Sequence, residues 1–279
     1  MTYKRISLLC TFLSLLISSL IAQPRPNGSP GIQNYHFSET GGSEQNWCII
    51  QDSRGLIYVG NHDKGILEYD GSSWRVIPVP GDVTVRSLVA GEDGYIYAGL
   101  AGNFGRLEPD LRGSLQFRPL LDSTLGNLYP DLDIWNTYYQ KGKVYFCGRE
   151  VIFVFDPASE EVSLIETHEH PFLAFFADDV LYMGDFALGL MKHDGDTFIE
   201  VPGGEFFSEK NISGLLTFDA NHLLVSTYSS GMFLLDLAEG KVDSTFLNPE
   251  LQENLNAATV VNIQIQDNKL FVGTFSEGL

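Results

Sequence analysis

The stretch WCIIQDSRGLIYVGNHDKGILEYDGSSWRVIPVP, residues 47–80, divides into four short runs separated by turns. Each run has the length of a β-strand and is rich in aromatic and β-branched residues. The segments DSRG (residues 52–55) and DGSS (residues 70–73) place a glycine where a tight hairpin needs a positive φ. The stretch therefore predicts a four-stranded antiparallel meander.

The same pattern recurs along the chain. Aligning the second predicted strand of each copy brings six residues into register, at intervals of 36 to 49 residues: Gly60, Gly99, Gly148, Gly184, Ser226 and Gly273. A period near 40 residues with four strands per unit is typical of a β-propeller blade. We expect an all-β fold of five complete blades and a truncated sixth, at approximately residues 47–80, 85–121, 134–168, 172–204, 212–247 and 260–279.

The last residues, FVGTFSEGL (271–279), match the segment around Gly60, which continues in the first copy into a third and a fourth strand. A propeller buries the faces of each blade against two neighbours. We therefore expect residues 23–279 to be an incomplete propeller, part of a longer chain with a ring of seven blades; a complete protein of 279 residues is the alternative. Residues 32–39 resemble an unpaired outer strand, and a short surface helix is expected from Asn248.

The N-terminal residues 1–22 have the pattern of a secretory signal. Lys4 and Arg5 precede an apolar run and a small-residue cleavage site. An uncleaved membrane anchor is the alternative, although the run is short for a full span. We expect export to the periplasm or the extracellular space. Cys48 and Cys147 lie in apolar runs, and we expect both to be buried and unpaired.

Charge limits the possible partners. Because residues 1–22 contain two basic and no acidic residues, the remainder carries 15 basic and 36 acidic residues, a net charge of −21. Such a surface repels nucleic acid and anionic membranes. We therefore expect no nucleic-acid partner for this part of the protein.

The repeats resemble those of the two-component regulator propeller family, the N-terminal periplasmic sensor propellers of hybrid two-component and triple-tyrosine-domain regulators in Bacteroidetes. The resemblance rests on Asp-x-x-Gly-x-(Ile/Leu)-(Tyr/Trp)-x-Gly followed by a Gly-Leu/Ile strand, as in DSRGLIYVGNHDKGILEYD from Asp52 and more loosely in EDGYIYAGLAGNFGRLEPD from Glu92. It covers residues 31–279 and weakens in the middle three repeats. It implies a full-length protein anchored in the inner membrane, dimeric, with C-terminal signalling domains such as a histidine kinase, and with oligosaccharides among its ligands.

A ligand site is expected where the loops after the second strands and between blades meet at one rim of the central channel. Aromatic faces beside amide and carboxylate groups suit a sugar. The candidate rim residues are Trp47, Asn61, His62, Asn103, Phe104, Trp135, Asn136, Arg149, Asp185 and Tyr228. Trp135 and Phe104 are the main stacking candidates, although aromatic residues at strand starts more often pack between blades. Arg149 could bind a ligand carboxylate, but we expect a local ion pair with Glu150 instead.

Catalytic and metal sites have little support in the sequence. His168 and His170 have a spacing that metal sites use, but no third ligand is signalled. No motif fixes a carboxylate pair, a Ser/His/Asp arrangement or a nucleotide-binding loop. We therefore expect neither a cofactor nor a metal, and the leading hypothesis is a ligand-sensing propeller that is not itself an enzyme. A secreted propeller glycosidase, lyase or lactonase and a surface protein-binding scaffold are the alternatives.

Overall fold

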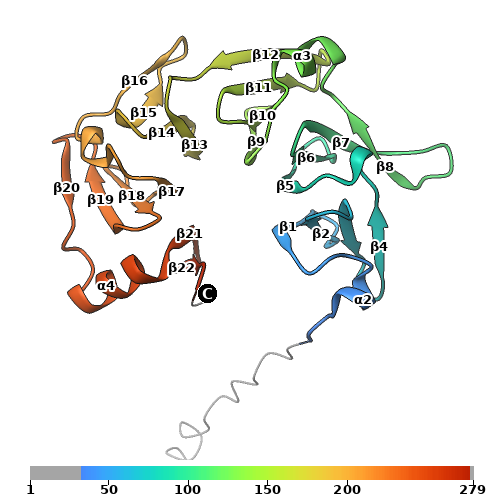
Figure 1. Ribbon diagram of the computed structural model, residues 1–279, viewed down its shortest axis with the longest axis horizontal. Helices are drawn as coiled ribbons and strands as arrows, with labels where there is room; N and C mark the ends of the chain where they lie inside the picture. Colours follow the sequence, from blue (N-terminus) through green and yellow to red (C-terminus); the bar gives the residue numbers. More distant parts are fainter. Residues whose placement is uncertain (1–32, 277–279) are drawn as a thin grey trace, which may run out of the picture. The chain divides into compact units, whose positions relative to one another are not determined.

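The computed structural model describes residues 33–276, and residues 36–279 form one unit, separate from residues 1–35. The secretory signal predicted at residues 1–22 lies outside the described residues. Within the larger unit, five four-stranded antiparallel sheets are followed by a two-stranded one, and every sheet keeps its strands in chain order. This confirms the expected all-β fold of propeller blades (Figure 1).

The first three sheets comprise twelve strands, in chain order: β1 (Asn46–Gln51), β2 (Ile57–Asn61), β3 (Ile66–Tyr69), β4 (Trp74–Ile77), β5 (Val85–Ala90), β6 (Ile96–Leu100), β7 (Asn103–Pro109), β8 (Leu115–Pro119), β9 (Asn136–Gln140), β10 (Lys143–Cys147), β11 (Val151–Asp156) and β12 (Glu161–Glu166). The other three sheets comprise β13 (Pro171–Ala177), β14 (Val180–Asp185), β15 (Gly189–His193), β16 (Phe198–Glu200), β17 (Ile212–Thr217), β18 (His222–Thr227), β19 (Gly231–Asp236), β20 (Lys241–Asp243), β21 (Val260–Gln266) and β22 (Lys269–Thr274).

Helices connect the sheets or precede them: α2 (Phe37–Thr40), α3 (Ser123–Leu128), α4 (Pro249–Ala258) and the 3-10 turns η1 (Pro80–Asp82) and η2 (Gly204–Phe207). The helix expected from Asn248 is α4, and the Asn248 side chain caps it by accepting from the Leu251 N–H. The outer strand expected at residues 32–39 is wrong: residues 37–40 form a helical turn, because His36 caps it and Gly41 ends it in the left-handed conformation.

Apolar side chains between neighbouring sheets form the core. The innermost strands β1, β5, β9, β13, β17 and β21 lie side by side in that order around a common centre (Figure 1). Between the second and third sheets the buried cluster includes Tyr97, Phe104, Phe146, Phe153 and Phe155. Within residues 33–276, the first and last sheets have no neighbouring sheet on one face. Ile49 on β1 is therefore 68% exposed, whereas Leu88 at the same register in β5 is buried.

Three of the aligned glycines, Gly60, Gly99 and Gly184, lie where the next sheet approaches closely. A Cβ at Gly99 would overlap Ile134 and lie 2.6 and 2.8 Å from the hydroxyl oxygens of Ser87 and Thr137. At Gly273, the equivalent residue of the last sheet, nothing lies closer than 3.8 Å. The second junction therefore has no room for a side chain at Gly99, whereas the last sheet has room for one at Gly273.

We expect Gly99→Ala to lower the free energy of unfolding by about 1–3 kcal/mol, because the added methyl group overpacks the junction. Gly273→Ala is the matched control and should change it by less than about 0.5 kcal/mol. Urea unfolding of both variants measures the difference. Equal stability of the two would contradict this account of the junction.

Both cysteines of the described residues are free thiols, Cys147 buried and Cys48 half-buried. Burial raises the pKa of Cys48 to about 12. Such thiols are poor nucleophiles. Among residues 33–276, no helix combines the length and the apolar character that a bilayer span requires.

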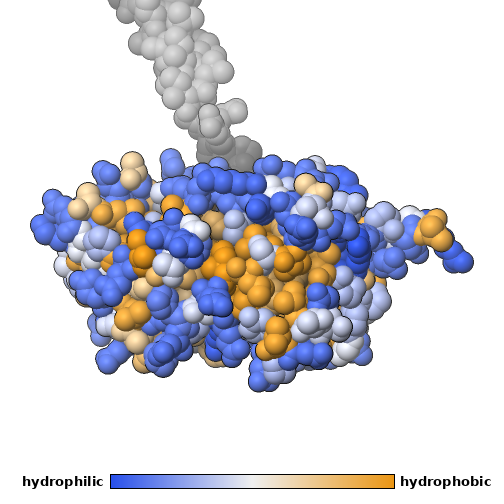
Figure 2. All heavy atoms as spheres, turned by 90° about the horizontal axis from the view of Figure 1, so that it is seen from above, coloured by the Kyte–Doolittle hydropathy of each residue, from blue (hydrophilic) through white to orange (hydrophobic). Residues whose placement is uncertain are grey.

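Side chains at the surface are mostly polar, in keeping with the acidic composition. Figure 2 shows one face, on which apolar side chains gather in an area surrounded by hydrophilic ones. The large apolar residues exposed in the described part include Leu111 at the β7–β8 turn and Phe275 after β22.

Candidate functional site

Aromatic rings and arginine side chains alternate across the first three sheets. The Arg86 guanidinium carbon lies 4.1 Å from the centre of the Trp47 ring and 4.4 Å from that of the Trp135 ring. A cation this close to both ring faces is attracted by their quadrupoles. One arginine therefore joins an aromatic residue of the first sheet to one of the third.

A carboxylate holds Arg86 in place. Its Nε and Nη2 donate to the two oxygens of Asp133, each at 3.0 Å. Bidentate pairs of this kind are stronger and more directional than single hydrogen bonds. The Arg86 side chain is only 16% exposed and packs on both tryptophans, whose rings also meet edge-on with centres 6.0 Å apart.

The alternation continues into the fourth and fifth sheets. The Arg149 guanidinium carbon lies 5.0 Å from the Trp135 ring centre and 5.1 Å from that of Phe172. The Phe172 ring in turn meets Tyr228 edge-on, with centres 5.4 Å apart. We name the set of Trp47, Arg86, Trp135, Arg149, Phe172 and Tyr228 the aromatic–arginine row.

An irregularity repeated in the innermost strands places several of these side chains. In β1 the pairing with the second strand shifts between Asn46 and Cys48, and Cys48 lies opposite the aligned Gly60. In β5 it shifts in the same way between Val85 and Ser87. The shift in β13 falls between Pro171 and Ala174. Bulges redirect a side chain out of the strand's alternation. Trp47, Arg86 and Phe172 occupy these positions, which explains why they lie in one row.

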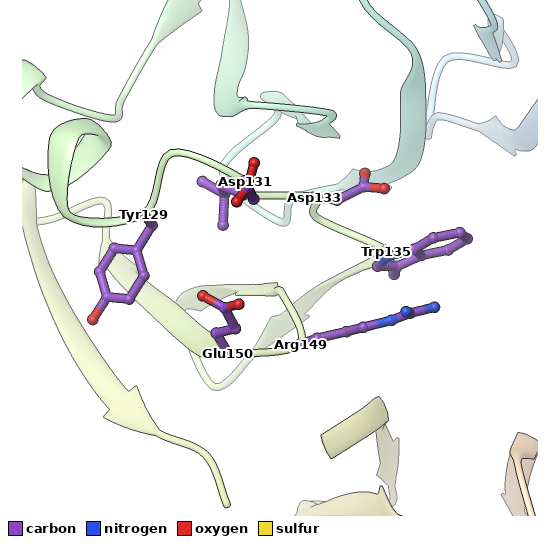
Figure 3. Close-up of a pocket in the computed structure, with 7 residues that line it drawn as sticks. Tyr129, Asp131, Asp133, Trp135, Arg149 and Glu150 are labelled. Atoms are coloured by element: carbon purple, nitrogen blue, oxygen red, sulfur yellow. The ribbon is translucent and has the colours of Figure 1, made fainter. Parts of the chain in front are cut away.

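A pocket of about 300 Å³ opens beside the row. It is lined by Tyr129, Asp131, Leu132, Asp133, Trp135, Arg149 and Glu150. Figure 3 shows the Arg149 side chain running alongside Trp135 at one end, and the Asp131 and Glu150 carboxylates with Tyr129 toward the other. The pocket therefore offers a cation and an aromatic face at one end and hydrogen-bond acceptors at the other.

Four of the ten predicted residues belong to the row: Trp47, Trp135, Arg149 and Tyr228. The sequence interpretation missed Arg86 and Phe172. The signal that could have found Arg86 is its place in VRS, which aligns with Trp47 in NWC. The ion pair expected between Arg149 and Glu150 is absent from the ion pairs of residues 33–276, so that expectation is wrong.

Asn61 is buried and structural rather than a rim residue. Its side-chain oxygen accepts from the backbone N–H and the hydroxyl of Ser43, at 3.0 and 2.8 Å. Its amide donates to the carbonyl oxygens of Ser43 and Gln45 and to the side chain of Asn46. Because this bonding uses its whole capacity, the prediction of Asn61 as a ligand contact is wrong.

Phe104 and Asp185 are also wrongly predicted. Phe104 is fully buried because it lies in β7 rather than in a loop, and its ring stacks on Phe146 with centres 4.3 Å apart. Asp185 is buried at the end of β14, where it accepts from the N–H groups of Ala187 and Leu188 at 2.8 and 2.9 Å. It forms the turn into β15.

The remaining predicted residues lie outside the row. Asn136 donates to the hydroxyl oxygen of Tyr138 and, at 3.3 Å, to the carbonyl of Ala174, so it ties the third sheet to the fourth. The His62 ring lies 3.0 Å from the Thr84 hydroxyl. The Asn103 side chain accepts from the next residue's N–H, at 2.8 Å.

Tyr228 stays protonated at neutral pH. Burial raises the pKa of its phenol, and the positive charge of Arg149 offsets only part of that effect. The hydroxyl is therefore available as a hydrogen-bond donor at the end of the row. His168, the first of the two histidines considered as metal ligands, lies with its Nε2 3.1 Å from the Phe198 carbonyl.

No family model and no curated protein matches the chain. Among solved structures, it is similar to the extracellular domain of BT4673 from B. thetaiotaomicron, which is assigned to a one-component or a hybrid two-component system. The TM-score is 0.59 at 16% identity, over 82% of this chain and 30% of that one. This chain thus spans less than a third of that domain.

Similar structures also include an enzyme. A virginiamycin B lyase from Staphylococcus aureus, solved as an inactive variant with quinupristin, gives a TM-score of 0.63 at 10% identity, over 83% of this chain and 78% of the lyase. At such identities the likeness concerns the fold. The comparisons therefore confirm that this chain has a β-propeller fold, shared by the extracellular domain of BT4673 and by a lyase.

Proposed function

We propose that this chain is the extracytoplasmic ligand-sensing propeller of a membrane signal-transduction protein and that it binds a carbohydrate or a similar small ligand along the aromatic–arginine row. The observation that carries the proposal is the row itself, in which side chains from five successive sheets converge on one rim. The fold shared with the extracellular domain of BT4673 supports the location and the sensing role.

A sugar suits this rim for physical reasons. Its C–H faces stack on aromatic rings, while its hydroxyl groups need paired donors and acceptors. Trp135 supplies an aromatic wall of the pocket, and Asp131 and Glu150 supply acceptors. The pocket is at the small end of the volumes typical for ligand sites, so it holds about one ring.

The proposed signal is a change in how neighbouring sheets pack. Since the row links five sheets, a ligand that contacts several of its members favours one arrangement of those sheets over others. In the proposed full-length protein, a dimer anchored in the inner membrane passes this change to C-terminal signalling domains of the same chain.

A lyase is the second candidate, because a propeller lyase is among the similar structures. The Asp131 and Glu150 carboxylates at the pocket are the groups that acid–base chemistry would need. Release of products from a panel of oligosaccharides would favour the enzyme. Binding without turnover favours the sensor.

The test is calorimetric titration of the full chain with neutral and acidic oligosaccharides, for wild type and Trp135→Ala. We expect the substitution to weaken binding by about 30-fold or more, since a stacking tryptophan at the centre of a site is worth about 2 kcal/mol or more. Trp74→Ala is the control, because Trp74 stacks on Tyr69 at the outer strand β4, away from the row. Equal affinity of wild type and Trp135→Ala would contradict a site on the row.

A further inference from the structure

Arg149 is held in place without a counter-ion. Of the seven arginines in residues 33–276, five pair with a carboxylate, whereas Arg149 and Arg112 do not. Arg112 lies exposed on the β7–β8 turn. Arg149 instead lies between two aromatic rings and lines the pocket.

This arrangement leaves the hydrogen-bonding capacity of Arg149 unused. The guanidinium carbon lies 5.0 Å from the Trp135 ring centre and 5.1 Å from that of Phe172, and neither ring accepts a conventional hydrogen bond. The N–H donors point outward in the guanidinium plane, where their geometry matches a carboxylate. Because the aromatic contacts fix the side chain beforehand, little rotamer freedom is lost when an anion binds.

Arg86 is already neutralised by Asp133. Among the residues that line the pocket, Arg149 is therefore the arginine whose charge is not paired. Arg86 occupies both oxygens of Asp133. Asp131 and Glu150, toward the other end, form no ion pair among the described residues and can accept hydrogen bonds from hydroxyl groups (Figure 3). The pocket thus has a cationic end beside an aromatic face and an acceptor end.

We propose that the ligand of this rim is a sugar that bears a carboxylate, a hexuronate. Its carboxylate pairs with Arg149, its C–H groups contact the Trp135 side chain at the pocket wall, and its hydroxyl groups donate to Asp131 and Glu150. This inference rests on the proposed ligand-sensing function and specifies its ligand class. The two carboxylates also orient the ring, because the ligand carboxylate is repelled from their end of the pocket.

The experiment compares the affinity for a charged sugar acid with the affinity for its uncharged methyl ester. Trisaccharides of galacturonate, glucuronate and mannuronate are titrated calorimetrically into the full chain, each beside its methyl ester, which keeps the ring and loses the charge. The corresponding monosaccharides show whether a free sugar or a polymer segment is bound. The proteins are wild type, Arg149→Gln, Arg149→Lys and the control Arg112→Gln, which removes the same charge away from the rim.

We expect wild type and Arg112→Gln to bind at least one acid about 10- to 100-fold more tightly than its ester, the range of a charge-assisted bidentate bond. Arg149→Gln should bind acid and ester equally, and Arg149→Lys should recover part of the preference. The proposal is overturned if wild type prefers no acid over its ester, or if Arg149→Gln keeps the preference. A neutral sugar that binds and depends on Trp135 would overturn this inference and leave the proposed function standing.

Discussion

Phe104→Ala should lower the free energy of unfolding by about 3–5 kcal/mol, the range for removing a buried phenylalanine ring. Phe104 is fully buried between the second and third sheets, with its ring centre 4.3 Å from that of Phe146 and 4.8 Å from that of Phe153. The substitution removes a whole ring from a close-packed junction and leaves a cavity that strands cannot fill.

Urea unfolding followed by tryptophan fluorescence measures the effect. Phe186→Ala is the matched control, because Phe186 follows Asp185 at the rim and is 47% exposed. We expect the control substitution to lower the free energy of unfolding by less than about 1 kcal/mol. Should Phe104→Ala be as stable as Phe186→Ala, the ring would not be part of the core, and the rim role that the sequence suggested would return.

Arg106→Met should destabilise the protein by about 3 kcal/mol, because it removes two charge-assisted hydrogen bonds, to Glu108 and Glu160, and leaves both carboxylates to Arg118 alone. The Arg106 side chain is only 6% exposed and pairs with Glu108 on its own strand and with Glu160 of the third sheet, each at 2.6 Å. Its guanidinium carbon also lies 4.7 Å from the Tyr95 ring centre. Arg118 completes the network.

The double variant Arg106→Met/Glu108→Gln, beside the single variant Glu108→Gln, tests the cause, since it removes both partners of the pair. We expect its loss of stability to be smaller than the sum of the two single losses. If the two losses simply add, the ion pair is not the origin of the effect.

The contribution of this network should depend on pH. Burial raises the pKa of Glu108, but hydrogen bonds from Arg118 and Arg106 outweigh it, and the pKa lies below its ordinary value of 4.5. Hydrogen bonds from Arg106 and Arg118 likewise lower the pKa of Glu160. Carboxyls with a depressed folded-state pKa stabilise the protein above their unfolded-state pKa and lose that effect as acid protonates them.

The difference in stability between wild type and Arg106→Met should therefore be full at neutral pH and shrink below about pH 4.5. Urea unfolding of both proteins at about pH 7 and about pH 3 measures it. A difference that stays constant over this range would mean that packing of the arginine stem, rather than its charge, supplies the stability.

Much of the fold follows from local sequence pattern. The hairpin glycines, the strand-length runs and the recurrence of the aligned positions from Gly60 to Gly273 predict the blades, because strands, turns and their order are local properties. The helix after Asn248 was predictable for the same reason, since its cap is sequence-local. The short helix α3 was not, because six residues with Gly126 inside carry little pattern.

The candidate site depends on contacts between residues far apart in the chain, which local pattern does not contain. Trp135 and Arg149 could be proposed as exposed loop residues, but the contacts of Trp135 with Arg86 and of Arg149 with Phe172 required the neighbouring sheets to be in place.

Phe104 and Asn61 show the limit most clearly. Each follows or ends a predicted strand, where a side chain can face the channel or the interior. Because Phe104 pairs with Gly99, its ring lies in the junction between the second and third sheets. Asn61 is buried because Ser43 and Asn46 form hydrogen bonds with its side chain. The spacing of residues thus determines the repeat and its turns. The direction of each rim side chain is instead determined by packing between sheets, because its burial depends on the residues of the neighbouring sheet.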